Sequence, residues 1–340
     1  MLPSVRPRRL AFLAGLPLSL LAATLASLVM LGTGAQGAVG NPLRQFNAQV
    51  PNCSATWSTG LAFDGTALIR SCWYSNVLQR INPADGSALT PLTLTGISDV
   101  ASLTWDGTRQ KLWACSGGPN VYQIDTTTRV ATFKFQVSSC VDGLAYDPVD
   151  DTLWAGCDAC TTLDHYAITG TLIHRFTGVD QKLGGHGRSG IAVQGANLYL
   201  SNSGGEQVYK CTKDLVTCTL IATFPSTHRI EDLECDDRTF APKTVVWAQD
   251  DATTTLIAFE AATGSCDGSG TPASTATPTR TATPTTAGAS TATSTGTATR
   301  TPTATSTRTA TRTPTATITP GGPTATATPC PPGLHKKGIC

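Results

Sequence analysis

The phrase GLAYDPVDDTLWAGCDAC, residues 143–160, returns in related forms along the chain. Two versions precede it: GLAFDGTALIRSCWYSN at 60–76 and SLTWDGTRQKLWACSGG at 102–118. Two follow it: GIAVQGANLYLSNSGG at 190–205 and DLECDDRTFAPKTVVWAQDD at 232–251. Each version reads as a short apolar run, a polar turn and a second β-rich run. Such repetition indicates an architecture in which neighbouring units bury each other's apolar faces.

The repeat has the period of propeller blades. Its anchors lie roughly forty residues apart, and they are Leu61, Leu103, Leu144, Ile191 and Leu233. Asp-Gly between alternating apolar runs, as at 64–65 and 106–107, is a strong hairpin signal. The sequence predicts an all-β fold, a β-propeller of five four-stranded blades, with six blades as the alternative. The last unit lacks a fourth strand, which NPLRQFNAQV (41–50) can supply.

The two ends of the chain differ from this repeat. Residues 1–38 have a basic start, a long apolar run and small residues at the end, which predicts a secretory signal peptide or, if uncleaved, a membrane anchor. After the propeller, assigned to 39–266, residues 267–329 are nearly all Thr, Ala, Pro, Ser and Gly. This composition is typical of a disordered stalk, either O-glycosylated or a plain spacer. Residues 330–340 form a tail bounded by cysteines.

The charge of the chain limits the classes of partner that it can bind. The formal net charge is +1 and the arginines of the stalk are sparse, which argues against nucleic acid and against strong attraction to a membrane surface. We therefore expect an extracellular or cell-surface monomer whose partners are proteins or glycans. Membrane contact would come only from an uncleaved N-terminal segment.

All twelve cysteines follow the export signal, and an even number in an exported protein indicates disulfides. In a propeller, the loops before each first strand share a face with the loops between the second and third strands. This topology predicts the pairs Cys53–Cys72, Cys115–Cys140, Cys157–Cys160, Cys211–Cys218, Cys235–Cys266 and Cys330–Cys340.

CDAC, residues 157–160, permits two other interpretations. A redox dithiol needs a thiolate at a helix N-terminus, and the following TTLDHYAITG reads as a strand. A zinc site needs two further ligands, and only His165 is near, without a second Cys-x-x-Cys. A structural disulfide, either within this loop or from it to Cys140, is therefore the favoured interpretation.

Polar residues gather just before the anchors, where the first strands of the blades converge on a central channel. We expect a site there, with the binding candidates Asp99, Asp142, His186, Arg188, Glu231 and Asp232. Carboxylates from different blades can hold Ca²⁺ or another divalent metal, for which Asp142 and Glu231 are the candidates. Equally, they can accept hydrogen bonds from backbone N–H groups and water. No other cofactor is expected, and Ser189, in GRSG, lacks the nucleophile elbow of a serine hydrolase.

The tryptophans fall into two groups. Trp113, Trp154 and Trp247 recur at equivalent positions of the second strands, which predicts packing between blades. Trp57 and Trp73 fall outside this register and lie near the loops that face the channel. These two are the candidates for stacking on a sugar or a peptide.

The sequence pattern that includes GLAFDG (60–65) and SCW (71–73) resembles that of secreted bacterial propellers of the NHL and YVTN-repeat type, over residues 55–262. The resemblance implies the architecture and not an activity, because propellers host many functions. We expect an exported recognition or scaffold module for protein or glycan partners. The alternative is an extracellular metal-dependent hydrolase, lyase or lactonase with a site in the channel. Metal-dependent propeller lactonases are similar in outline, although no motif here matches theirs residue by residue.

Overall fold

The computed structural model describes residues 39–48, 53 and 59–270. Their fold is all-β, with five four-stranded antiparallel sheets, as the sequence predicts. The helix in this part of the chain, α1 (Val179–Lys182), is four residues long. Within the described ranges, no helix is long and apolar enough to cross a membrane. The predicted signal peptide, Trp57, the stalk beyond residue 270 and the pair Cys330–Cys340 lie outside the described residues. Residues 267–270, which the sequence assigned to the stalk, are described, and Asp267 accepts a hydrogen bond from Ser265 there.

Each sheet is one blade. Blade 1 holds β2 (Leu61–Phe63), β3 (Leu68–Arg70), β4 (Val77–Ile81) and β5 (Ala88–Thr93). Blade 2 holds β6 (Ser102–Asp106), β7 (Lys111–Cys115), β8 (Asn120–Asp125) and β9 (Val130–Gln136). Blade 3 holds β10 (Leu144–Asp147), β11 (Thr152–Ala155), β12 (Thr162–Ala167) and β13 (Leu172–Thr177). Blade 4 holds β14 (Arg188–Gln194), β15 (Asn197–Asn202), β16 (Gln207–Thr212) and β17 (Cys218–Thr223). Blade 5 holds β18 (Ile230–Asp236), β19 (Val245–Asp250), β20 (Thr255–Glu260) and β1 (Pro42–Asn47).

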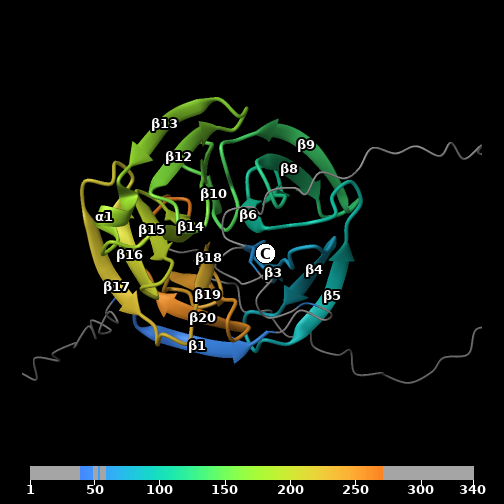
Figure 1. The fold of residues 1–340 in the computed structure, drawn as a ribbon. Helices are drawn as coiled ribbons and strands as arrows, with labels where there is room; N and C mark the ends of the chain where they lie inside the picture. Colours follow the sequence, from blue (N-terminus) through green and yellow to red (C-terminus); the bar gives the residue numbers. More distant parts are fainter. Residues whose placement is uncertain (1–38, 49–52, 54–58, 271–340) are drawn as a thin grey trace, which may run out of the picture. The chain divides into compact units, whose positions relative to one another are not determined.

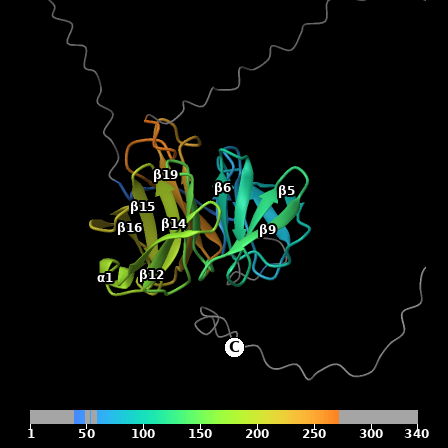
Figure 2. The same ribbon diagram turned by 90° about the horizontal axis from the view of Figure 1, so that it is seen from above.

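The blades are arranged around one axis, and Figure 1 looks along it. The first strand of each blade lies nearest the axis, and we call β2, β6, β10, β14 and β18 the inner strands. Every inner strand contacts the inner strands of both neighbouring blades. Figure 2 shows the blades from the side. The described residues thus form the predicted five blades, and not the alternative of six.

Strand β1 closes the ring. It comes from the N-terminal end of the propeller and pairs with β20, the last strand of the chain, with Arg44 opposite Ala258 and Phe46 opposite Leu256. The predicted use of residues 41–50 as the fourth strand of the last blade is confirmed. Because the first and last segments share one sheet, the ring has no open seam between its ends.

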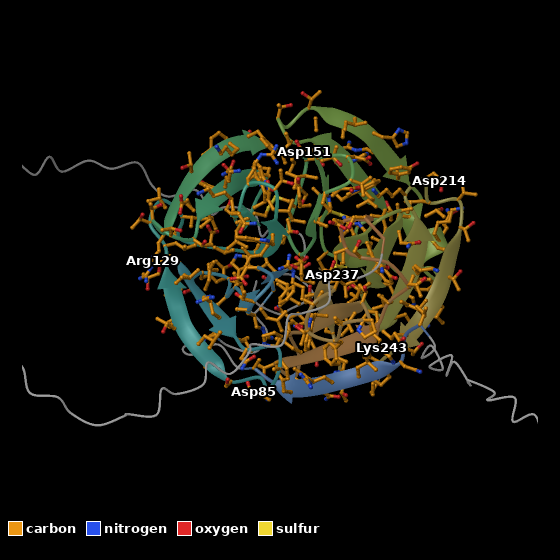
Figure 3. The ribbon with its side chains drawn as sticks, turned by 180° about the vertical axis from the view of Figure 1, so that it is seen from behind. Asp85, Arg129, Asp151, Asp214, Asp237 and Lys243 are labelled. Carbon is orange, nitrogen blue, oxygen red and sulfur yellow. A yellow bond between two sulfur atoms is a disulfide. The ribbon has the colours of Figure 1, made fainter. Side chains whose placement is uncertain are left out.

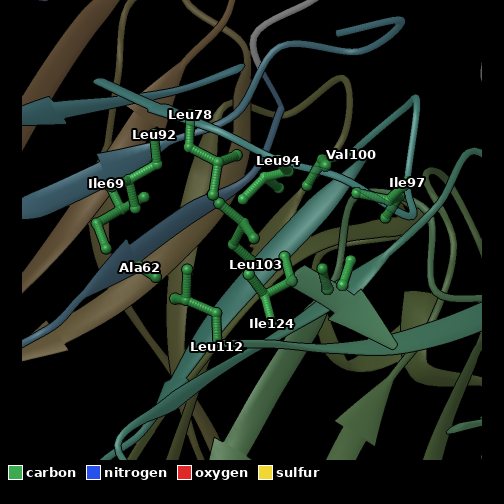
Figure 4. Close-up of a cluster of buried hydrophobic side chains, with 12 residues drawn as sticks. Ala62, Ile69, Leu78, Leu92, Leu94, Ile97, Val100, Leu103, Leu112 and Ile124 are labelled. Atoms are coloured by element: carbon green, nitrogen blue, oxygen red, sulfur yellow. The ribbon is translucent and has the colours of Figure 1, made fainter. Parts of the chain in front are cut away.

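Apolar side chains fill the spaces between neighbouring blades. Figure 4 shows one such cluster, in which Ala62 and Ile69 of blade 1 pack with Leu103 and Leu112 of blade 2. The in-register tryptophans lie in similar clusters and are 0–3% exposed, which confirms their predicted packing role; they are Trp113, Trp154 and Trp247. The same spacing that repeats the phrase in sequence therefore repeats the core in space.

A hydrogen bond fixes each of these tryptophans to its own blade. In three blades, the aspartate that ends the inner strand accepts a bond from the indole N–H: Trp113–Asp106 (3.1 Å), Trp154–Asp147 (3.2 Å) and Trp247–Asp236 (2.9 Å). The other oxygen of each carboxylate accepts a backbone N–H of the following turn. In each of these three blades, one aspartate thus orders both the turn and the tryptophan that packs the blade.

Five of the six predicted disulfides lie in the described residues, and all five are formed as predicted: Cys53–Cys72, Cys115–Cys140, Cys157–Cys160, Cys211–Cys218 and Cys235–Cys266. No described cysteine is free. Disulfides in this number indicate an oxidising, extracellular type of environment. They also exclude a zinc site at CDAC, because Cys157 and Cys160 are bonded to each other.

We predict that Asp147→Ala destabilises the propeller by about 1–3 kcal/mol, because the buried indole N–H of Trp154 loses its acceptor. The backbone N–H of Val149 and the ammonium group of Lys213 lose their partner as well. Thermal unfolding measures the change, which at this chain length corresponds to roughly 2–4 °C per kcal/mol.

The matched control is Asp150→Ala in the same turn. The Asp150 side chain is 48% exposed and lies 3.5 Å from Lys213. We expect its removal to change the stability by about 0.5 kcal/mol or less. Equal melting temperatures for the two variants would contradict the role assigned to the aspartate–tryptophan bond.

Candidate functional site

The channel has two different ends. We call the side on which the inner strands begin the strand-start face, and the side on which they end the strand-end face. The strand-start face also carries the connections between second and third strands, and with them Cys157–Cys160. The predicted site residues lie at the strand-start face. A cavity lies at the strand-end face, and a shallower hollow beside Asp99 lies at the strand-start face.

Neighbouring inner strands approach each other very closely at the strand-start face. A Cβ atom on Gly143 would lie 2.7 Å from the carbonyl oxygen of Ser189 in the next blade. One on Gly190 would lie 2.7 Å from the Cα of Asp232. Contacts below 3.0 Å do not occur for real Cβ atoms. Glycine at these positions therefore lets the backbones meet around the axis.

Three buried carboxyl groups meet in this crowded region. Asp142, Asp158 and Glu231 each place an oxygen within 4.8 Å of the others, and they come from blade 3, from its disulfide loop and from blade 5. Asp142 has a φ of 64°, a backbone conformation that is uncommon for a residue other than glycine. The structure thus brings together the two predicted metal candidates, Asp142 and Glu231, and adds Asp158 between them.

Two arginines lie against these carboxyl groups. The fully buried Arg188 donates to the carbonyls of Thr162 (3.1 Å) and Ser189 (2.9 Å). Burial lowers its pKa to about 10, while nearby carboxylates, including Asp158 and Asp142, oppose the shift. A guanidinium with this pKa stays charged at neutral pH. The cluster is therefore a mixed network of carboxylates and guanidinium groups and not an isolated group of acids.

The second arginine, Arg229, holds Glu231 in place. Its Nε atom lies 3.0 Å from Glu231 and 2.5 Å from the buried Asp251. Its neighbouring Nη2 donates to the second oxygen of Asp251 at 2.7 Å. Ser189 donates a hydroxyl hydrogen bond to Glu231 at 3.1 Å. Salt bridges and hydrogen bonds within the protein thus give much of this network a structural role.

The remaining predicted residues do not join this cluster. Asp232 is buried and accepts the backbone N–H of Leu61 at 2.8 Å, which ties blade 5 to blade 1. Asp99 accepts the N–H of Gly117 and lines a shallow hollow in blade 2. His186 is exposed on the loop before β14. Trp73 is only 2% exposed and packs in a small core cluster, so that its ring offers a ligand little surface.

A cavity of about 360 Å³ opens at the strand-end face. Every blade contributes the residue two positions after its anchor: Phe63, Trp105, Tyr146, Val193 and Cys235. The turns that follow the inner strands add polar groups, among them Asp64, Gln110, Asp237 and Arg238. In Figure 3, Asp237 lies near the middle of the ring, whereas Asp151, Asp214 and Lys243 lie toward its outside. The cavity is therefore the mouth of the channel at this end.

Glu234 lies in the floor of this cavity. The side chain starts on β18 in blade 5, and its carboxyl group reaches blade 2, where Thr104 and the backbone of Trp105 hydrogen-bond to it. The N–H of Cys235 donates to the same group at 3.2 Å. Burial raises the pKa of the Glu234 carboxyl group well above its usual range, and the hydrogen bonds counteract part of the shift.

Sequence reasoning missed both Glu234 and Asp158, but a signal for Glu234 was present. The residue that follows the anchor is small in the other four units, where it is Ala62, Thr104, Ala145 or Ala192. In the fifth unit it is glutamate. A charged residue at a position that is otherwise small and buried breaks a local rule of the repeat, and such breaks concentrate at functional sites. Asp158 had no comparable signal, because it lies in a loop and the other units offer no equivalent position with which to compare it.

No family model and no curated protein matches this sequence. Similar solved structures include the glutaminyl cyclase of Myxococcus xanthus, with a TM-score of 0.46 and 12% identity, over 65% of this chain and 94% of that one. U3-55K has a TM-score of 0.40 and 11% identity, over 62% and 63%. A streptogramin B lyase has 0.37 and 14%, over 59% and 64%. The resemblance to NHL and YVTN propellers stays a prediction.

We predict that Gly156→Ala lowers the melting temperature. Gly156 follows β11 in blade 3, and an added Cβ would lie 1.1 Å from Nη2 of Arg188. The guanidinium group must then leave its place beside the buried carboxylates, at a cost of about 1–3 kcal/mol or more. Thermal unfolding is again the measurement.

Gly118→Ala is the matched control, because Gly118 follows β7 in the equivalent connection of blade 2. A Cβ there meets nothing within 4 Å, and neither glycine has a positive φ. If both variants melt at the same temperature, Arg188 is not fixed in the position described.

Proposed function

We propose that this chain is an exported recognition module that binds a glycan in the cavity at the strand-end face. The observation that carries the proposal is the cavity itself, which lies on the axis and receives side chains from all five blades. Its volume falls in the range of small-ligand sites. A rigid ring closed by β1 and crossed by five disulfides can hold such a site without movement of its walls.

The lining of the cavity favours a sugar over a flat protein surface. Trp105 is partly exposed and supplies an aromatic wall, while Gln110, Asp237 and Arg238 supply hydrogen-bonding groups at the rim. An aromatic face stacks on the C–H surface of a sugar ring, and polar groups around it bind the hydroxyls. The exposed large apolar residues of the described ranges include Phe133 on β9, Ile173 on β13 and Leu220 on β17. They lie on the outer strands of three different blades, away from the cavity.

We expect Trp105→Ala to weaken binding of a soluble oligosaccharide about tenfold or more, because a central aromatic contact is removed. A glycan array with the secreted protein identifies the ligand, and calorimetry measures the affinity. Trp105 also packs against the core of blades 1 and 2, so its variant needs a folding check. Arg238→Ala is the second variant; its side chain is 59% exposed, and we expect it to keep the fold and lose affinity.

Tyr74→Ala is the control for this experiment. Tyr74 is an aromatic residue that is 52% exposed in the loop after Cys72, on the strand-start face. The proposal requires its removal to leave the affinity unchanged. Binding that depends on Tyr74 and not on Trp105 or Arg238 would place the ligand on the other face. The absence of any bound glycan would overturn the proposal.

The second candidate is the metal-dependent hydrolase, lyase or lactonase, and the specific observation in its favour is the meeting of Asp142, Asp158 and Glu231. Under this alternative, Asp142, Asp158 and Glu231 would hold a divalent cation, which would supply Lewis-acid chemistry beside Arg188 and Arg229. Elemental analysis of the purified protein would then find one metal per chain, and a chelator would lower the melting temperature. Asp158→Asn would release the metal. A metal-free protein that a chelator leaves unchanged would rule this candidate out.

A further inference from the structure

One blade departs from the repeat at the floor of the cavity, where it carries a glutamate in place of a small residue. Four blades place a small, buried residue after the anchor, and in three of them it packs in an apolar cluster between blades. Glu234 starts in blade 5 and reaches past blade 1 to Thr104 of blade 2. Thr104 in turn accepts the N–H of Tyr146 in blade 3 at 3.0 Å. Neighbours from several blades thus hold one carboxyl group in the floor of the cavity.

The cavity has an excess of acidic groups. Among the described residues that line it, four carry a carboxyl group and one carries a guanidinium group: Asp64, Glu234, Asp237, Asp267 and Arg238. Two of the acids have cationic neighbours, since Arg80 lies 3.5 Å from Asp64 and Arg238 lies 3.9 Å from Asp237. No ion pair within the described ranges involves Glu234 or Asp267.

Asp267 is held as an anion at the rim. Its carboxylate accepts hydrogen bonds from the hydroxyl of Ser265 (2.6 Å) and the N–H of Ser269 (2.9 Å), and these bonds keep the pKa of Asp267 below its usual range. Trp105 and Tyr146 bring aromatic rings to the same cavity, and aromatic faces attract cations. The anionic Asp267, the Glu234 carboxyl group without an ion-pair partner and the aromatic walls together describe a site for a cation.

We propose that the cavity selects glycans that carry a free amine, and that Glu234 is the residue that selects them. This inference rests on the proposed function, because it names the sugar class that the same cavity binds. The ammonium group of an amino sugar would supply the positive charge that the cavity lacks, with Glu234 below it and Asp267 at the rim. An N-acetylated sugar of the same shape lacks this charge and would bind more weakly.

The pH dependence of binding separates this inference from its main alternative. An ammonium group favours the ionised form of Glu234, so affinity must rise as pH increases through the raised pKa of this group. A neutral sugar that accepts a hydrogen bond from the protonated carboxyl group must show the opposite slope. Other ionisable groups near Glu234 are Asp232 and Asp236 on its own strand, Asp64 after β2, Tyr146 on β10, and Asp237, Arg238 and Asp267 in the rim. Only the Glu234 variant should remove the slope.

The experiment compares glucosamine oligomers with N-acetylglucosamine oligomers of equal length, by calorimetry on the secreted protein at the low and the high end of a pH series. Because the sugar amine loses its own proton near neutral pH, each affinity for the amine is expressed per protonated ligand. For the wild type we expect about tenfold or greater preference for the free amine, and an affinity for it that rises with pH. Glu234→Gln keeps the size and shape of the side chain, removes its charge and replaces one acceptor oxygen by an NH2 donor. We expect it to lose the preference and the slope while it still binds the N-acetylated oligomer.

The control is Asp214→Asn, which removes one negative charge from an exposed turn of blade 4 that lies toward the outside of the ring (Figure 3). It must keep the preference and the slope. If Glu234→Gln does not fold, the two pH arms on the wild type still decide the question. Equal affinity for the two oligomers, or an affinity for the amine that falls with rising pH, would overturn this inference and leave glycan binding intact. If neither oligomer nor any other sugar binds, the proposed function fails first.

Discussion

The close approach of five backbones around one axis is the constraint on which the rest of this structure depends. Each inner strand contacts both of its neighbours, and at the strand-start face Gly143 and Gly190 lie where any side chain would collide with the next blade. Gly60 is similarly constrained, since its Cβ would lie 3.0 Å from the backbone nitrogen of Leu103 in blade 2. Without such residues, the inner strands could not pack into a ring of only five blades, and the apolar clusters between blades would not close.

This constraint also explains why the two ends of the channel differ. At the strand-start face little space is left, and what remains is filled by Arg188 and by carboxylates that hydrogen bonds and charges hold in place. At the strand-end face the side chains two positions after the anchors surround the axis, and a cavity lies between them. The most highly charged part of the channel is therefore its most tightly packed part, and the space for a ligand lies at the opposite end.

The sequence was informative wherever a feature repeats. Five aligned phrases predicted the blades and, through their topology, the pairing of Cys53, Cys115 and the other described cysteines. The same alignment predicted that residues 41–50 complete the last blade. The open face of the channel had no such signal, because it depends on the packed volumes of five side chains from five blades. Polar residues before the anchors pointed to the strand-start face, where Asp232 and Arg188 bond to backbone groups and the three carboxyl groups meet. They carried no signal for the cavity on the axis, which lies at the opposite face.

A repeat makes its units equivalent, so a site that binds one ligand on the axis must depend on where the units differ. Glu234 is such a difference, and its place in blade 5 has a physical basis. Cys235 follows it and is fixed by the disulfide to Cys266, while Asp232 precedes it and bonds to Leu61 across the seam between the last blade and the first. Both neighbours limit the movement of the backbone that carries Glu234. A carboxyl group that reaches across the channel to Thr104 needs this support, because a shift of its strand would break contacts in another blade.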